Sequence, residues 1–85
     1  MTLDDLRAQW NDVLDALERT DRIAWMAFFD ARLSALEGGT LYLDFADARK
    51  LGGAHEYAPV RARHLELLQK SIAEVTGYTC EVVER

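Results

Sequence analysis

The side chains best suited to chemistry in this 85-residue chain are two histidines and a single cysteine. A metal site takes three or four ligands at short, regular spacing, and His55, His64 and Cys80 do not follow such a pattern. Cys80 lies between Tyr78 and Val82 in an apparent strand, where a buried and unreactive thiol is the common case. The sequence therefore predicts neither a metal site nor a cofactor.

Hydroxyl groups and glycines give no catalytic pattern either. Ser34 and Ser71 have no histidine or acid at the spacing expected of a nucleophile and its base. The pairs Gly38-Gly39 and Gly52-Gly53 lack the spaced glycines and the lysine of a phosphate-binding loop, so both predict turns. We therefore expect a protein that is not an enzyme.

Two helices are predicted at the start of the chain. Thr2 can cap the first, and its apolar stripe follows steps of three and four: Leu3, Leu6, Trp10, Val13, Leu14 and Leu17. After a short break near Arg19, the pair Thr20-Asp21 predicts a second cap. The second helix is expected over about 21–31 and packs against the first as a hairpin or at a steep angle.

A β-hairpin is predicted next. Residues 32–36 form a short strand, and Gly38-Gly39 supplies the positive φ angles of a tight turn. Residues 41–45 then alternate strictly, with Leu41, Leu43 and Phe45 on one face, as in a half-buried strand.

The second half of the chain adds helices and one strand. Residues 47–51 are expected to form one helical turn, and Pro59 fits the first position of a longer helix. The buried stripe of this helix is Leu65, Leu68, Ile72 and Val75, with Gly77 as its C-terminal cap. A last strand is expected over 78–83.

This order predicts a single α+β domain over residues 1–85, α-α-β-β-(short α)-α-β, with a three-stranded sheet and the helices packed on one face. It resembles the KH fold, which grips an RNA backbone with a GxxG loop between two helices. No GxxG occurs in this chain, so a KH-like topology is expected without that grip.

Seven consecutive apolar residues, 23–29, occupy the second predicted helix. At about 100° per residue they cover every face of the helix, and the run is far shorter than the roughly 20 residues of a membrane span. One interpretation is complete burial under the other helices. The other is an exposed apolar patch for a protein partner or for self-association, with Trp25 and Phe29, one turn apart, as anchors.

Charge is unevenly distributed along a chain with a net charge of −5. Residues 1–47 hold ten acidic side chains against four basic ones, whereas residues 48–72 hold five basic against two acidic. The alternative function is therefore a weak nucleic-acid-binding module that uses Arg49, Lys50, Arg61 and Arg63. The single cysteine and the acidic first residues, which do not resemble a signal peptide, favour a cytoplasmic location.

Several segments together resemble one known family. They are the W-x-x-V-L start at residues 10–14, the R-x-x-W helix at 22–25 and the G-x-T-L-x-L-x-F strand at 38–45, followed by residues 68–77 and a closing strand. These features resemble the small C-terminal-region domain of the tau subunit of bacterial DNA polymerase III, in its actinobacterial form. The N-terminal domain of the replication initiator DnaA is similar in layout.

The resemblance implies a non-enzymatic interaction domain of the replisome. Its partner would be another replication protein, such as a polymerase or helicase subunit, or a second copy in a homodimer. We expect the contact on the second helix, through Arg22, Trp25, Met26 and Phe29. A small accessory protein of a different role that merely shares the fold remains a further alternative.

Overall fold

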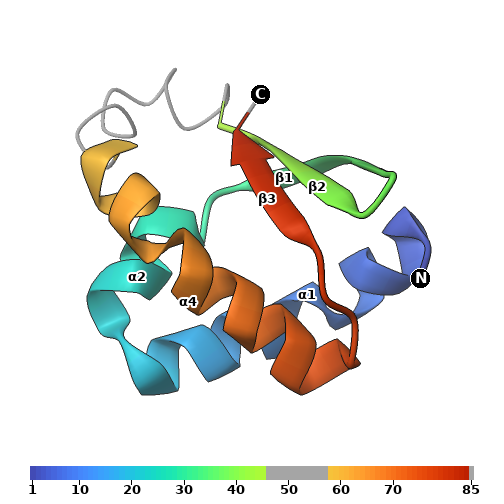
Figure 1. The fold of residues 1–85 in the computed structure, drawn as a ribbon. Helices are drawn as coiled ribbons and strands as arrows, with labels where there is room; N and C mark the ends of the chain where they lie inside the picture. Colours follow the sequence, from blue (N-terminus) through green and yellow to red (C-terminus); the bar gives the residue numbers. More distant parts are fainter. Residues whose placement is uncertain (46–57, 85) are drawn as a thin grey trace.

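The computed structural model describes residues 1–45 and 58–84. In chain order the elements are α1 (Leu3–Thr20), α2 (Arg22–Phe28), β1 (Arg32–Glu37), β2 (Thr40–Asp44), α4 (Ala58–Thr76) and β3 (Glu81–Glu84) (Figure 1). The predicted helical turn at 47–51, the glycine pair at 52–53 and His55 lie outside the described residues. Among the described helices, none is long and apolar enough to cross a membrane.

The structure has two layers, a three-stranded sheet and a layer of helices against one of its faces (Figure 1). β2 is the central strand, with β1 antiparallel on one side and β3 parallel on the other. Parallel neighbours need a long crossover, and the chain between β2 and β3 includes α4. The predicted α+β architecture is confirmed.

The first helix begins where its sequence predicts. The Thr2 hydroxyl accepts a hydrogen bond from the Asp5 N–H at 3.1 Å, and the Asp5 carboxylate accepts one from the Thr2 N–H at 3.2 Å, which completes a capping box. Hydrogen bonding of the Asp5 carboxylate to the backbone N–H of Thr2, and secondly to the Thr2 side chain, lowers the pKa of Asp5. The predicted stripe turns inward, with four members buried and two partly buried: Leu6, Trp10, Val13 and Leu17, then Leu3 and Leu14.

The hairpin also follows its local signals. Gly38 and Gly39 have φ angles of +57° and +80°, the left-handed region that side chains with a Cβ adopt only under strain. Leu41, Leu43 and Phe45 are buried, as their alternation predicts. β1 runs one residue further than expected, and a bulge between Leu33 and Ala35 shifts its register against β2.

The last strand starts later than predicted, at Glu81 rather than Tyr78. The Tyr78 N–H donates to the Thr76 hydroxyl at 3.1 Å, so Tyr78 lies in the turn that follows α4. Pairing begins where β2 begins, with Thr40 opposite Glu81. Gly77, at a φ of +75°, ends α4 as expected.

The second helix is shorter than predicted, because it ends at Phe28 and Phe29 forms its C-cap. The Ala31 N–H donates to the Phe28 carbonyl at 3.0 Å, which closes a tight turn into β1. Phe28 is completely buried, whereas half of the surface of Phe29 is exposed. Two neighbouring phenylalanines therefore have opposite environments.

This difference predicts opposite effects of two equivalent truncations. Phe28→Ala leaves a cavity in the core and is expected to lower the free energy of unfolding by about 3–5 kcal/mol. Phe29→Ala removes an exposed ring and is expected to cost less than about 1 kcal/mol. Chemical denaturation followed by circular dichroism measures both, and equal losses would contradict the assigned orientation of α2.

Candidate interaction surface

The position of α2 is set by Asp21, which lies between the two first helices. The Asp21 N–H donates to the Leu17 carbonyl at 2.8 Å and so closes the end of α1. Its carboxylate accepts hydrogen bonds from the N–H groups of Ile23 and Ala24 at 2.9 and 3.2 Å, which caps α2. One residue thus ends one helix and starts the next.

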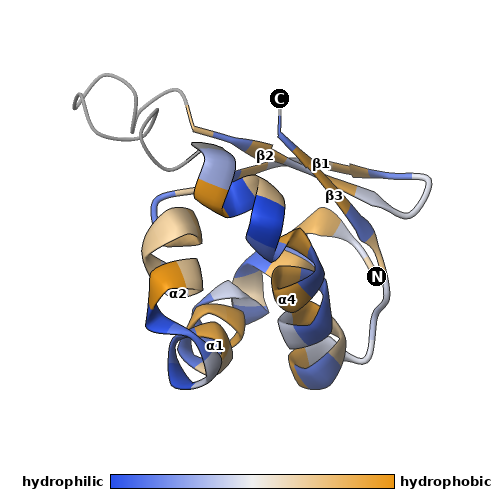
Figure 2. Ribbon diagram, turned by 60° about the vertical axis from the view of Figure 1, so that its left-hand side comes forward, coloured by the Kyte–Doolittle hydropathy of each residue, from blue (hydrophilic) through white to orange (hydrophobic). Residues whose placement is uncertain are grey.

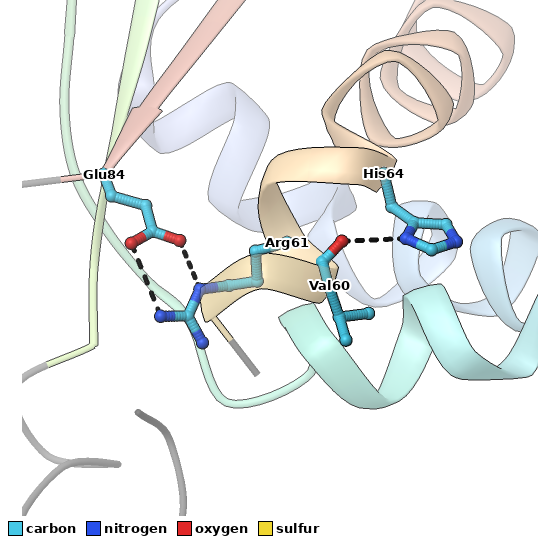
Figure 3. Close-up of polar contacts among 4 residues, drawn as sticks. All are labelled: Val60, Arg61, His64 and Glu84. Carbon is cyan, nitrogen blue, oxygen red and sulfur yellow. Dashed lines mark hydrogen bonds and ion pairs between the residues drawn. The ribbon is translucent and has the colours of Figure 1, made fainter. Parts of the chain in front are cut away.

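The same carboxylate also contacts α4. Asp21 Oδ2 lies 3.4 Å from His64 Nε2, an ion pair when the imidazole is protonated. The other ring nitrogen, Nδ1, lies 2.8 Å from the Val60 carbonyl one turn earlier in α4, which orients the ring (Figure 3). His64 therefore serves as a contact between helices, and it links the start of α2 to α4.

With its start fixed in this way, α2 divides its apolar residues between two faces. Ala24, Ala27 and Phe28 are buried in the core. On the opposite face Ile23, Met26 and Phe29 are 60%, 38% and 50% exposed, and their spacing of three keeps them on one side of the helix. Neither complete burial nor complete exposure holds for residues 23–29, because one face of α2 lies in the core and the other is open to solvent.

Trp25 lies at the margin of this exposed face. It is half-buried, packs against the core and stacks on Phe29, with 5.1 Å between ring centroids and 23° between ring planes. We call Ile23, Trp25, Met26 and Phe29 together the α2 patch. Figure 2 shows α2 at the outer side of the helical layer, with strongly apolar colouring.

Charged residues flank the α2 patch at both ends. Arg22, predicted at its edge, is exposed at the first position of α2, and Asp30 is exposed just beyond its end. Within the described ranges 1–45 and 58–84, neither side chain has an ion-pair partner. The arrangement is an apolar centre with a charged rim, as found in many protein interfaces.

The structure brings together three of the four predicted contact residues and adds one that the sequence reasoning missed. Trp25, Met26 and Phe29 belong to the α2 patch, with Arg22 on its rim. The missed residue is Ile23, the most exposed large apolar side chain of the described chain. Its position three residues before Met26 and six before Phe29 was the signal that pointed to a shared face.

Of the two basic residues of the alternative site that the structure describes, only one is exposed. Arg61 is only 3% exposed, and its guanidinium pairs with the Glu84 carboxylate (Figure 3). The guanidinium also lies 4.0 Å from the centre of the Phe45 ring. Arg63 is exposed on α4, whereas Arg49 and Lys50 lie outside the described residues. Arg61 therefore holds α4 against the end of the sheet and does not face solvent.

Other possible sites are shallow. Two surface hollows lie beside α4 and the approach to β3, and both are lined in part by Gln69 and Thr79. Across the described ranges, no three His, Cys, Asp or Glu side chains are grouped so that they could hold a metal ion. Cys80 is a buried free thiol, and desolvation by burial raises its pKa.

Comparison with known proteins adds no relative. No protein-family model matches the chain, and no curated protein or solved structure is similar enough to count as a match. The resemblance to the tau-type domain therefore stays a prediction from the sequence.

The ion pair of Arg61 predicts a structural role for this residue. Arg61→Ala removes the contacts with Glu84 and Phe45 and is expected to lower the free energy of unfolding by about 2 kcal/mol. Arg63→Ala, two residues away and exposed, is the matched control and is expected to change it by less than about 0.5 kcal/mol. Urea denaturation compares the two variants, and equal stabilities would show that the Arg61–Glu84 pair contributes nothing.

Burial and the raised pKa of Cys80 predict slow alkylation. A pKa above the ordinary value leaves less thiolate at pH 8, and the thiolate is the reacting form. The folded chain should react with iodoacetamide at least about tenfold more slowly than the chain unfolded in urea. Mass spectrometry over time measures both rates, and similar rates would show that Cys80 is accessible.

Proposed function

We propose that this chain is a non-enzymatic protein–protein interaction domain and that it binds its partner through the α2 patch. The observation that carries the proposal is the exposure of Ile23, Met26 and Phe29 on one helix face. Single exposed apolar residues are common on protein surfaces, but a contiguous group of large ones usually marks a contact site. Aromatic side chains such as Trp25 and Phe29 are also enriched among the residues that dominate binding energy.

The geometry of α2 favours binding because the patch is already ordered. The Asp21 cap fixes the start of the helix, and Ala24, Ala27 and Phe28 hold it in the core. Stacking against Trp25 restrains the exposed Phe29 ring. A partner would therefore meet side chains that lose little further conformational freedom, which lowers the cost of association.

The sequence resemblance extends the proposal to the class of partner. It implies another replication protein, such as a polymerase or helicase subunit, or a second copy of the chain, met in the cytoplasm. The α-α-β-β-α-β order of the described elements is the order that this resemblance requires. A small accessory protein of different role would present the same α2 patch, and the identity of the partner separates these two cases.

A nucleic-acid-binding function has less support. Its site needs several free cations on one surface, and Arg61 is buried and paired with Glu84. Protein binding through the α2 patch is therefore the function that the described geometry supports best.

The proposal predicts that one substitution abolishes binding without unfolding the domain. A tagged chain is incubated with an extract of its source cells and with an untagged copy of itself, and bound proteins are identified by mass spectrometry. Phe29→Asp places a charge in the apolar contact and is expected to reduce recovery of the specific partner by at least about tenfold. Circular dichroism checks that the variant is folded.

The matched control is Val83→Asp. Val83 is the exposed apolar residue of β3, at 42% exposure, so this variant makes a similar chemical change away from α2. Recovery of the partner should be unchanged. The proposal fails if wild type and Phe29→Asp recover the same proteins in equal amounts.

A further inference from the structure

We propose that the partner of the α2 patch is the same patch on a second copy of this chain. The two α2 helices would lie antiparallel across a two-fold axis that passes beside Met26. This inference rests on the proposed function, because it names the occupant of the same surface. It is carried by the even spacing of Ile23 and Phe29, and of the charges Arg22 and Asp30, about Met26.

Two apolar residues of the α2 patch and the two charges that flank it are spaced evenly about Met26, whereas Trp25 lies to one side. Ile23 and Phe29 lie three residues before and after Met26, and Arg22 and Asp30 lie four residues before and after it. At about 100° per residue, Ile23 and Phe29 lie roughly 60° to either side of Met26, and Arg22 roughly 40° to one side. Asp30 lies in the turn directly after the C-cap Phe29, so only its level along the helix follows from the spacing. Apart from the half-buried Trp25, all of these side chains are exposed.

A two-fold axis would make two copies of this surface complementary to each other. In an isologous interface, if residue i contacts residue j of the other copy, then j contacts i. In an antiparallel pair that crosses at Met26, Ile23 lies at the level of Phe29 of the second copy. Arg22 then lies at the level of Asp30 of the second copy, so an apolar centre is closed by two opposite-charge pairs.

The charges favour a second copy over an unrelated helix. Arg22 and Asp30 have no ion-pair partner among the residues that the structure describes, so each is available to another molecule. Antiparallel association pairs both cations with both anions, whereas parallel association would place like charges together. The antiparallel order also brings opposite ends of the two helix dipoles together.

The size of the patch limits the strength of this dimer. A helix of seven residues is about 10 Å long, so the contact buries well under the roughly 800 Å² per partner of a standard interface. A net charge of −5 on each copy also opposes association. We therefore expect a reversible dimer with a dissociation constant of roughly tens of micromolar at about 0.15 M salt.

Charge reversal followed by charge exchange tests the arrangement. Sedimentation equilibrium of the whole chain from low micromolar to about 1 mM gives the dimer dissociation constant. Arg22→Glu and Asp30→Arg each place like charges opposite one another, and each should weaken the dimer about tenfold. The double variant restores opposite charges and the original net charge, so its dissociation constant should return to within about threefold of wild type.

Two controls separate the local pair from the change in net charge. Arg63→Glu and Asp12→Arg make the same changes in net charge at exposed positions of α4 and α1. Both should change the dissociation constant by less than about threefold. Phe29→Asp should remove the dimer altogether.

The possible results distinguish failure of the two-fold arrangement from failure of the proposed function. A double variant no stronger than the single variants, or a Phe29→Asp variant that still dimerises, would overturn the two-fold arrangement. A strict monomer at all concentrations would also overturn it, but the proposed function would stand if the extract yields a foreign protein that Phe29→Asp fails to recover. If neither self-association nor a foreign protein depends on the α2 patch, both proposals fail.

Discussion

The arrangement of this domain depends on the three contacts of Asp21. Its N–H closes α1, its carboxylate caps α2, and the same carboxylate reaches His64 on α4. A helix of seven residues is not stable by itself in water, so α2 persists because its start and its buried face are held by neighbours. Because the contact with His64 and the burial of Ala24, Ala27 and Phe28 fix the rotation of α2 about its axis, Ile23, Met26 and Phe29 face outward.

A second restraint acts three residues before His64, at the start of α4. Arg61 in its first turns pairs with Glu84 at the end of β3 and lies over the ring of Phe45 just after β2. Burial of a guanidinium is costly unless a carboxylate and further contacts compensate, and Arg61 has both. The ion pair therefore holds α4 against the sheet, and α4 in turn supplies His64, the residue that contacts the cap of α2.

The sequence predicts those parts of the structure that have local causes. The Gly38-Gly39 turn follows from backbone sterics, and the stripes of α1 and α4 follow from helical periodicity. The division of α2 into a buried face and an exposed face had no such local cause. Seven apolar residues in a row show no helical periodicity, so tertiary contacts choose which face is buried. For the same reason Ile23 was missed and Arg61 was counted as a surface cation, although its partner Glu84 lies 23 residues away.

Stability of the fold does not explain the outer face of α2. Ile23, Met26 and Phe29 keep much of their surface in water, so polar residues at these positions would cost little core packing. Helix propensity does not require them either, since β-branched and aromatic residues are only moderate helix formers. Exposed apolar surface promotes non-specific association, and a chain that retains it in one ordered patch with Arg22 and Asp30 at its two ends has the features of a specific contact. The even spacing of those charges about Met26 supports the proposed pairing with a second copy.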